Sequence, residues 1–214
     1  MVSTRNLESL PGIDALKKLC KAIAALEAII SPEWEYRYYS YDSQWAIGEE
    51  CATMRDGEGD EYLILFNQAG AIINGLAHEA EQQQVSKENI PVEFHDFIFG
   101  EPVKSVGTTF CIWKKYDENQ WHSAHNQSAQ GNSYGDGSED LLFILDENPK
   151  TYQKWAEEYY EGQLVEKLPL HTIKQMYDGA PLTREMVLAL NPALDDWPKL
   201  MADLDEIAYP YVLG

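Results

Sequence analysis

Residues 62–66, Tyr-Leu-Ile-Leu-Phe, and residues 71–77, Ala-Ile-Ile-Asn-Gly-Leu-Ala, are separated only by the turn sequence Asn-Gln-Ala-Gly at 67–70. Each run has the length of a buried strand, and both are rich in large apolar side chains. A gap this short permits antiparallel pairing, whereas parallel strands need a long crossover connection. The two runs therefore predict a β-hairpin at the centre of an antiparallel sheet.

Further strands are expected on both sides of this hairpin. The aromatic run at 34–41 lacks helical spacing and predicts a strand with Trp34, Tyr36 and Tyr38 on one face. The other expected strands lie at 49–55, 108–116, 121–123 and 141–145. Together with the hairpin they give an antiparallel sheet of about six strands.

Helices are expected at both ends of the chain. Apolar residues recur at helical spacing over 10–30, and Ser31-Pro32 ends that pattern. Asn148 is a natural N-cap before Pro149. Helical patterns follow at 149–162, 169–177 and 183–190, and in a last helix capped by Asp195 or Asp196. The sequence predicts an α+β fold in a single domain, 1–214: an N-terminal helix and the sheet in 1–146, then C-terminal helices in 147–214 that pack on the sheet.

The charge of the chain limits its partners. It has 36 acidic and 16 basic side chains and a formal net charge of −20, and the first 30 residues are nearly neutral. An acidic surface repels nucleic acid and anionic lipid and attracts basic proteins. No signal peptide or membrane-spanning run is apparent, so we expect a cytoplasmic protein with no nucleic-acid or membrane partner. Cys20, Cys51 and Cys111 are expected to be buried free thiols.

Two acidic turns are the first candidate sites. Asp56, Glu58 and Asp60 lie in one turn, and Asp136, Glu139 and Asp140 lie in the other. If both turns lie at one end of the sheet, they form a joint acidic pocket. The first turn could also bind Ca²⁺, although it lacks the glycine and the bidentate glutamate of a standard calcium loop. A solvated hairpin turn is the simpler interpretation.

Aromatic residues at the first strand are a second candidate site. On the face opposite Trp34, Tyr36 and Tyr38 we expect Tyr39 and Tyr41 to be exposed, with Trp45 nearby. Exposed tyrosine and tryptophan among carboxylates suit a protein interface. Ordinary packing of an amphipathic strand is the alternative.

His78 and His122 are candidate metal ligands. Two histidines and a carboxylate from the acidic turns could bind a transition metal. Structural or solvent-exposed histidines are the more common situation. The sequence contains no phosphate-binding glycine loop and no zinc-type cysteine pattern, and we expect no cofactor.

Several stretches together resemble a family of uncharacterised bacterial cytosolic proteins of about this length. They are 33–40, 54–62, 75–79, 108–113 and 136–142. No activity is known for that family, so the resemblance implies a bacterial, cytosolic setting and transfers no catalytic residue.

The leading functional hypothesis is a non-enzymatic module that presents an acidic, aromatic surface to a basic protein partner. An immunity-type protein that neutralises a basic toxin is its most specific form. The alternative is a metal-dependent hydrolase that uses His78, His122 and carboxylates of the acidic turns. A third hypothesis is a protein that only forms homodimers through exposed aromatics. The sequence leaves the oligomeric state undetermined.

Overall fold

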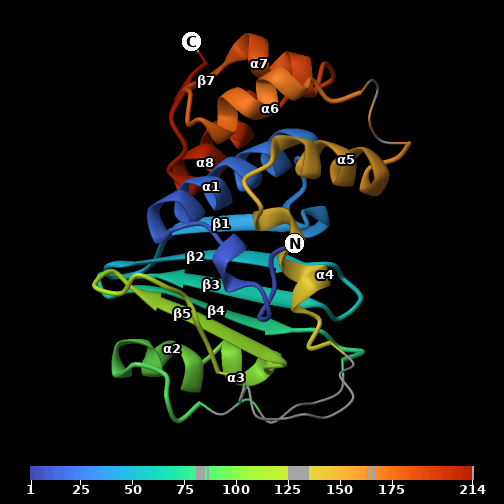
Figure 1. Cartoon of the computed structure of the whole chain (residues 1–214). Helices are drawn as coiled ribbons and strands as arrows, with labels where there is room; N and C mark the ends of the chain where they lie inside the picture. Colours follow the sequence, from blue (N-terminus) through green and yellow to red (C-terminus); the bar gives the residue numbers. More distant parts are fainter. Residues whose placement is uncertain (81–84, 86, 125–134, 163, 165–166, 214) are drawn as a thin grey trace.

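The computed structural model describes residues 1–80, 85, 87–124, 135–162, 164 and 167–213. Its centre is an antiparallel sheet in the order β1-β2-β3-β4-β5-β6, so each strand pairs with its neighbour in the sequence (Figure 1). The strands are β1 (Tyr39–Ala46), β2 (Glu49–Arg55), β3 (Glu61–Phe66), β4 (Gly70–Leu76), β5 (Phe110–Lys115) and β6 (His122–Ser123). The predicted hairpin is confirmed: Leu65 pairs with Ile72, and Ile64 pairs with Ile73.

Helices surround this sheet. They are α1 (Ile13–Ile30), α2 (His95–Phe99), α3 (Val103–Val106), α4 (Ser138–Leu142), α5 (Pro149–Tyr159), α6 (Leu170–Tyr177), α7 (Arg184–Leu190) and α8 (Trp197–Ile207). Short 3-10 helices lie at Leu7–Ser9, Trp34–Tyr36, Val92–Phe94 and Phe143–Leu145. A small parallel pair joins β7 (Leu182–Thr183) to β8 (Tyr211–Val212). The predicted α+β architecture is therefore confirmed.

Both faces of the sheet are buried. On one face Ile64 and Ile73 join a core built with α1, α4 and the C-terminal helices. On the other face Leu63, Leu65 and Ile72 pack with the apolar side chains of α2 and α3. Because strands buried on both faces have no polar side to alternate with, the central hairpin reads as two continuous apolar runs.

The C-terminal helices pack mainly around α1. Helices α6, α7 and α8 contact α1, and α8 also contacts β1 at the edge of the sheet (Figure 1). Helix α1 is therefore enclosed by the sheet and by these helices. The predicted caps are confirmed: Asn148 accepts a hydrogen bond from the backbone of Lys150, and Asp196 accepts one from that of Lys199.

One predicted strand begins later than expected, and another is wrong. Residues 34–36 form a 3-10 turn, and β1 begins only at Tyr39. The apolar run at 141–145 is helical, in α4 and the following 3-10 turn, where Leu142, Ile144 and Leu145 are all completely buried. A short continuous apolar run buries its side chains equally well as a strand or as a helical turn, so its pattern did not separate the two.

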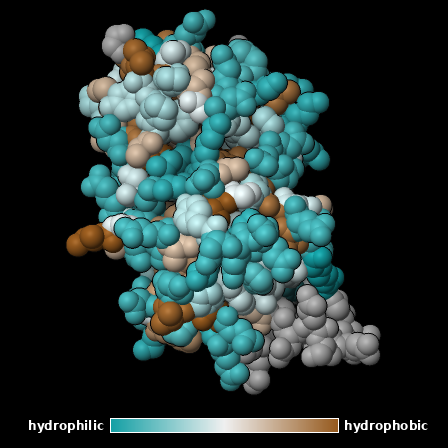
Figure 2. All heavy atoms as spheres, turned by 60° about the vertical axis from the view of Figure 1, so that its left-hand side comes forward, coloured by the Kyte–Doolittle hydropathy of each residue, from teal (hydrophilic) through white to brown (hydrophobic). Residues whose placement is uncertain are grey.

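The three cysteines are free and buried, as predicted. Burial raises the pKa of the Cys51 and Cys111 thiols to about 12. In the part of the chain that the structure describes, no helix combines the length and the apolar character needed to cross a membrane. The face shown in Figure 2 is largely hydrophilic, with small and separate hydrophobic patches.

One buried carboxyl group connects three of these elements. Glu27 of α1 is fully buried, and it accepts hydrogen bonds from the Tyr152 hydroxyl at 2.8 Å and the Tyr160 hydroxyl at 2.7 Å. It also accepts from the backbone amides of Tyr38 at 3.0 Å and Tyr39 at 3.4 Å. Burial raises the pKa of Glu27, while these four hydrogen bonds act in the opposite direction. Glu27 thus joins α1 to the start of β1 and to α5, through Tyr152 within that helix and Tyr160 directly after it.

Replacing Glu27 by Ala should destabilise the fold by about 3 kcal/mol or more, because two hydroxyl and two amide donors would lose their acceptor in the core. Chemical denaturation monitored by circular dichroism measures this. Glu185→Ala, which removes an exposed carboxylate from α7, is the control and should change the free energy of unfolding by less than about 0.5 kcal/mol. Equal stabilities of the two variants would contradict a structural role for Glu27.

Candidate functional site

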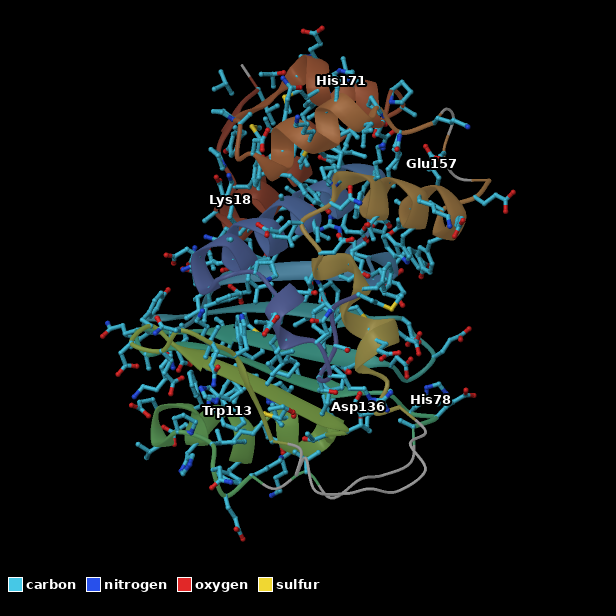
Figure 3. The ribbon with its side chains drawn as sticks, viewed as in Figure 1. Lys18, His78, Trp113, Asp136, Glu157 and His171 are labelled. Carbon is cyan, nitrogen blue, oxygen red and sulfur yellow. The ribbon has the colours of Figure 1, made fainter. Side chains whose placement is uncertain are left out.

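The two acidic turns meet at one end of the sheet, where β3 begins and β4 finishes. Asp60 from the β2–β3 turn lines the same hollow of about 340 Å³ as Asp136, Glu139 and Asp140 from the start of α4. The pairing of β3 with β4 places His78 beyond the end of β4, opposite Asp60. Figure 3 shows Asp136 and His78 side by side at this end of the sheet. The hollow is therefore the joint acidic pocket that the sequence predicted for the case in which both turns lie at one end of the sheet.

Asp136 connects two of the segments that form this hollow. It is only 8% exposed, and its carboxylate accepts hydrogen bonds from the Thr4 hydroxyl at 2.5 Å and from the Ser138 hydroxyl at 2.6 Å. It also accepts from the Ser138 amide at 3.0 Å. Asp136 therefore attaches the N-terminal segment to α4, whereas Glu139 and Asp140 on the same segment are exposed.

Asp56 has a similar structural role in the other turn. Its Oδ1 accepts hydrogen bonds from the amides of Glu58, Gly59 and Asp60 at 2.8 to 2.9 Å. This arrangement closes the turn around the glycines and leaves Glu58 exposed. The backbone thus uses an oxygen that a calcium ion would need.

His78 forms a close pair with Asp60. The ring Nδ1 lies 2.8 Å from Asp60 Oδ1, and the same oxygen accepts a hydrogen bond from the His78 amide at 2.8 Å. The hydrogen bond to Asp60 raises the pKa of His78, and the nearby carboxylates of Glu79 and Asp56 add to this effect. Part of the negative charge of the hollow is therefore balanced when His78 is protonated.

The structure does not bring His78 and His122 together. His122 pairs with Trp113 across β5 and β6, its ring stacks on that indole, and its Nε2 lies 3.5 Å from a Glu118 carboxylate oxygen. Trp113 also pairs with Ile72, six residues before His78 on an extended strand, a separation of about 20 Å. Figure 3 shows Trp113 and His78 far apart across the sheet. Within the described ranges, no three His, Cys, Asp or Glu side chains are grouped so that they could hold a metal ion.

The prediction that Tyr39 and Tyr41 are exposed is wrong. They are only 3% and 2% exposed, since Tyr39 packs against Trp155 of α5 and the Tyr41 hydroxyl donates to Glu50 at 2.7 Å. Trp45, farther along β1, is 38% exposed. The predicted outward and inward faces assume a strand that starts at Trp34. The chain instead forms a 3-10 turn ahead of β1, and this turn reverses which aromatics face outward.

Trp34, Tyr36 and Tyr159 are exposed, at 50%, 66% and 45%. Tyr36 and Tyr159 line a groove of about 810 Å³ between the α1–β1 connection, the β2–β3 turn and the end of α5. Trp34 and Tyr36 were expected to lie inward, on the face opposite Tyr39 and Tyr41. Glutamates alternate with aromatics over 33–36, and this alternation is a sequence signal for an exposed segment.

Carboxylates surround this groove. Glu33, Glu35 and Asp56 line it. The β2–β3 turn begins at Asp56, which lines the groove, and ends at Asp60, which lines the hollow at α4. We call this set of carboxylates the acidic edge. Its members are Glu33, Glu35, Asp56, Glu58, Asp60, Glu139 and Asp140. In the described chain no Lys, Arg or His nitrogen lies within 4 Å of the carboxylates of Glu33, Glu35, Asp56 or Glu58.

No family model, no curated protein and no solved structure matches this chain. The resemblance noted from the sequence therefore remains a prediction, and functional inference rests on the geometry.

The pKa of His78 should fall when Asp60 is replaced by Asn, because the amide carries no charge to favour the imidazolium. NMR titration of the ring protons measures this shift. Asp140→Asn, which removes another carboxylate from the same hollow, is the control and should leave the pKa of His78 close to that of the original protein. A pKa unchanged in Asp60→Asn would contradict the pairing.

Proposed function

We propose that this protein is a non-enzymatic binding module that engages a basic protein partner through the acidic edge. The main support is the convergence of two turns about 80 residues apart in the sequence on one edge of the sheet. Only Asp60 and Glu139 of these seven carboxylates lie within 4 Å of a cationic side chain in the described chain: Asp60 of His78, and Glu139 of Arg5 at the 4.0 Å limit.

Such a surface suits a basic partner for an electrostatic reason. Uncompensated carboxylates at one edge of a highly acidic chain produce a negative potential that attracts a positively charged protein and orients it on approach. The exposed rings of Trp34, Tyr36 and Tyr159 add apolar contact area at the same place, and tyrosine and tryptophan are frequent energetic centres of interfaces. Tyr39 and Tyr41, which are buried, have no part in this proposal.

An immunity-type protein that neutralises a basic toxin in the cytoplasm is the most specific form of the proposal. In that case association has to be fast and selective, and charge complementarity provides both. Neither the chemistry of the hollow nor the separation of His78 from His122 favours the hydrolase alternative.

Charge reversal at the acidic edge should strongly reduce capture of the partner. The tagged original chain and a tagged Glu35→Lys/Glu58→Lys/Asp140→Lys variant would each be incubated with native lysate at low and at high salt. We expect the original chain to capture one basic protein at low salt and to lose it at high salt, because exposed charges are screened. Once that protein is purified, the variant should associate with it at least about tenfold more slowly.

The matched control is Asp178→Lys/Glu185→Lys/Asp195→Lys, which makes the same change of charge at exposed positions around α6, α7 and α8. It should retain the partner at low salt. A partner that is retained by the edge variant, or one whose binding is insensitive to salt, would contradict the proposal.

A further inference from the structure

The groove beside the acidic edge has the size and shape of a binding site. At about 810 Å³ it lies in the range of cavities that enclose a small ligand or a few residues of a peptide. Its walls come from three separate parts of the chain: the α1–β1 connection, the β2–β3 turn and the end of α5. Tyr160, which forms part of one wall, is fixed by its hydrogen bond to Glu27.

The groove is suited to a cation. Glu33, Glu35 and Asp56 bring more negative charge than the Arg55 guanidinium in the same lining balances, and the exposed rings of Tyr36 and Tyr159 also line it. The nearby carboxylates affect the pKa of both tyrosines. A hydrogen bond to Glu35 raises the pKa of Tyr36, and burial raises that of Tyr159 with added effects of Glu27, Asp56 and Glu58.

The lining of the groove also presents a hydrogen-bond donor. Arg37 lines the groove but is only 6% exposed; its Nε donates to the Ser31 carbonyl at 2.8 Å, and its Nη2 donates to the Pro32 carbonyl at 2.7 Å and to Asp203 at 2.5 Å. In the described chain its Nη1 has no hydrogen-bond partner, and this nitrogen is accessible to solvent. A nearly buried guanidinium nitrogen with one open side is complementary to an external acceptor.

The acceptor at Arg37 is better neutral than anionic. Asp203 already balances the charge of this guanidinium, and Glu33 and Glu35 would repel a phosphate or a carboxylate. A peptide carbonyl supplies the acceptor without added charge. The groove is therefore complementary to one ligand, a peptide with a basic side chain.

The basic side chain fits better as arginine than as lysine. The guanidinium of Arg55, which lines the groove, lies 3.8 Å from the centre of the Trp34 ring and shows that this surface accommodates a planar cation stacked on an aromatic ring. A guanidinium can stack on tyrosine and hydrogen-bond to a carboxylate with two nitrogens at once, whereas an ammonium is a point charge.

We infer that the groove binds an arginine-containing peptide segment, whose guanidinium lies at Tyr36, Tyr159 and Glu35 and whose backbone carbonyl accepts a hydrogen bond from Arg37. This inference rests on the proposed function, because it names the part of the basic partner that the acidic edge would hold.

The direct test uses the full chain and four synthetic peptides, acetyl-Gly-Ala-Xaa-Ala-Gly-amide, in which Xaa is Arg, Lys, citrulline or Glu. Binding is followed by amide chemical shifts in NMR titrations. The arginine peptide should saturate shifts at 33–37 and at the β2–β3 turn, the lysine peptide should bind severalfold more weakly, and the uncharged citrulline peptide at least tenfold more weakly. Equal binding of the citrulline or the lysine peptide, or preferred binding of the glutamate peptide, would overturn the inference.

Two variants locate the site. Glu35→Gln and Tyr36→Ala change exposed side chains of the groove and should each weaken binding of the arginine peptide at least threefold. Glu185→Gln removes an exposed carboxylate from α7 and should leave it unchanged. If Glu185→Gln weakened binding as much as Glu35→Gln, the peptide would be responding to general charge, and the groove would not be its site.

Failure of this inference can be separated from failure of the proposed function. If the arginine peptide does not bind while the charge-reversal variant still loses the basic partner, the inference about the groove is wrong and the acidic edge retains its role. If the arginine peptide binds selectively but no basic protein is captured at low salt, the groove remains a guanidinium site and the proposed partner is wrong.

Discussion

The carboxyl group of Glu27 is the interaction on which the rest of the structure depends. A carboxyl group in an apolar core has a large desolvation cost unless donors surround it, and here four donors from β1 and α5 do so. Because the donors come from separate elements, satisfying Glu27 fixes how α1, β1 and α5 sit relative to one another. Tyr160, one of those donors, is also part of the wall of the groove. The shape of the candidate site thus follows from a polar contact in the core.

Burial of both faces of the sheet determines where function can lie. Helices α2 and α3 cover one face, and α1 with its neighbouring helices covers the other. The strand ends remain accessible, and the β2–β3 turn, the connection before β1 and the start of α4 gather there. Asp56 and Asp136 use their carboxylates to shape this edge, while Glu35, Glu58 and Asp140 remain exposed. Carboxylates that stabilise the backbone and carboxylates that provide surface charge therefore lie within a few residues of one another in the sequence.

Much of the fold could be predicted because its signals are local. Helical spacing, the caps at Asn148 and Asp196, and the hairpin over 62–77 each depend on neighbouring residues, and all are observed. The missed features depend on distant contacts. Residues 141–145 are helical because of what they pack against, and the two acidic turns meet because of the strand order. Glu27 could have been recognised, since it falls at helical spacing between Ile23 and Ile30 on the apolar face of α1.

Native-state amide hydrogen exchange in Glu27→Gln compared with the original chain tests the central role of this residue most directly. An amide side chain replaces one acceptor oxygen by a donor, so some of the four donors lose their partner. We predict that protection falls at least about tenfold at Tyr38, Tyr39 and α5, and much less at Ile64 and Ile73 in the centre of the sheet. Unchanged protection at Tyr38, Tyr39 and α5, or a uniform fall over the whole chain, would contradict the account that Glu27 holds these elements together.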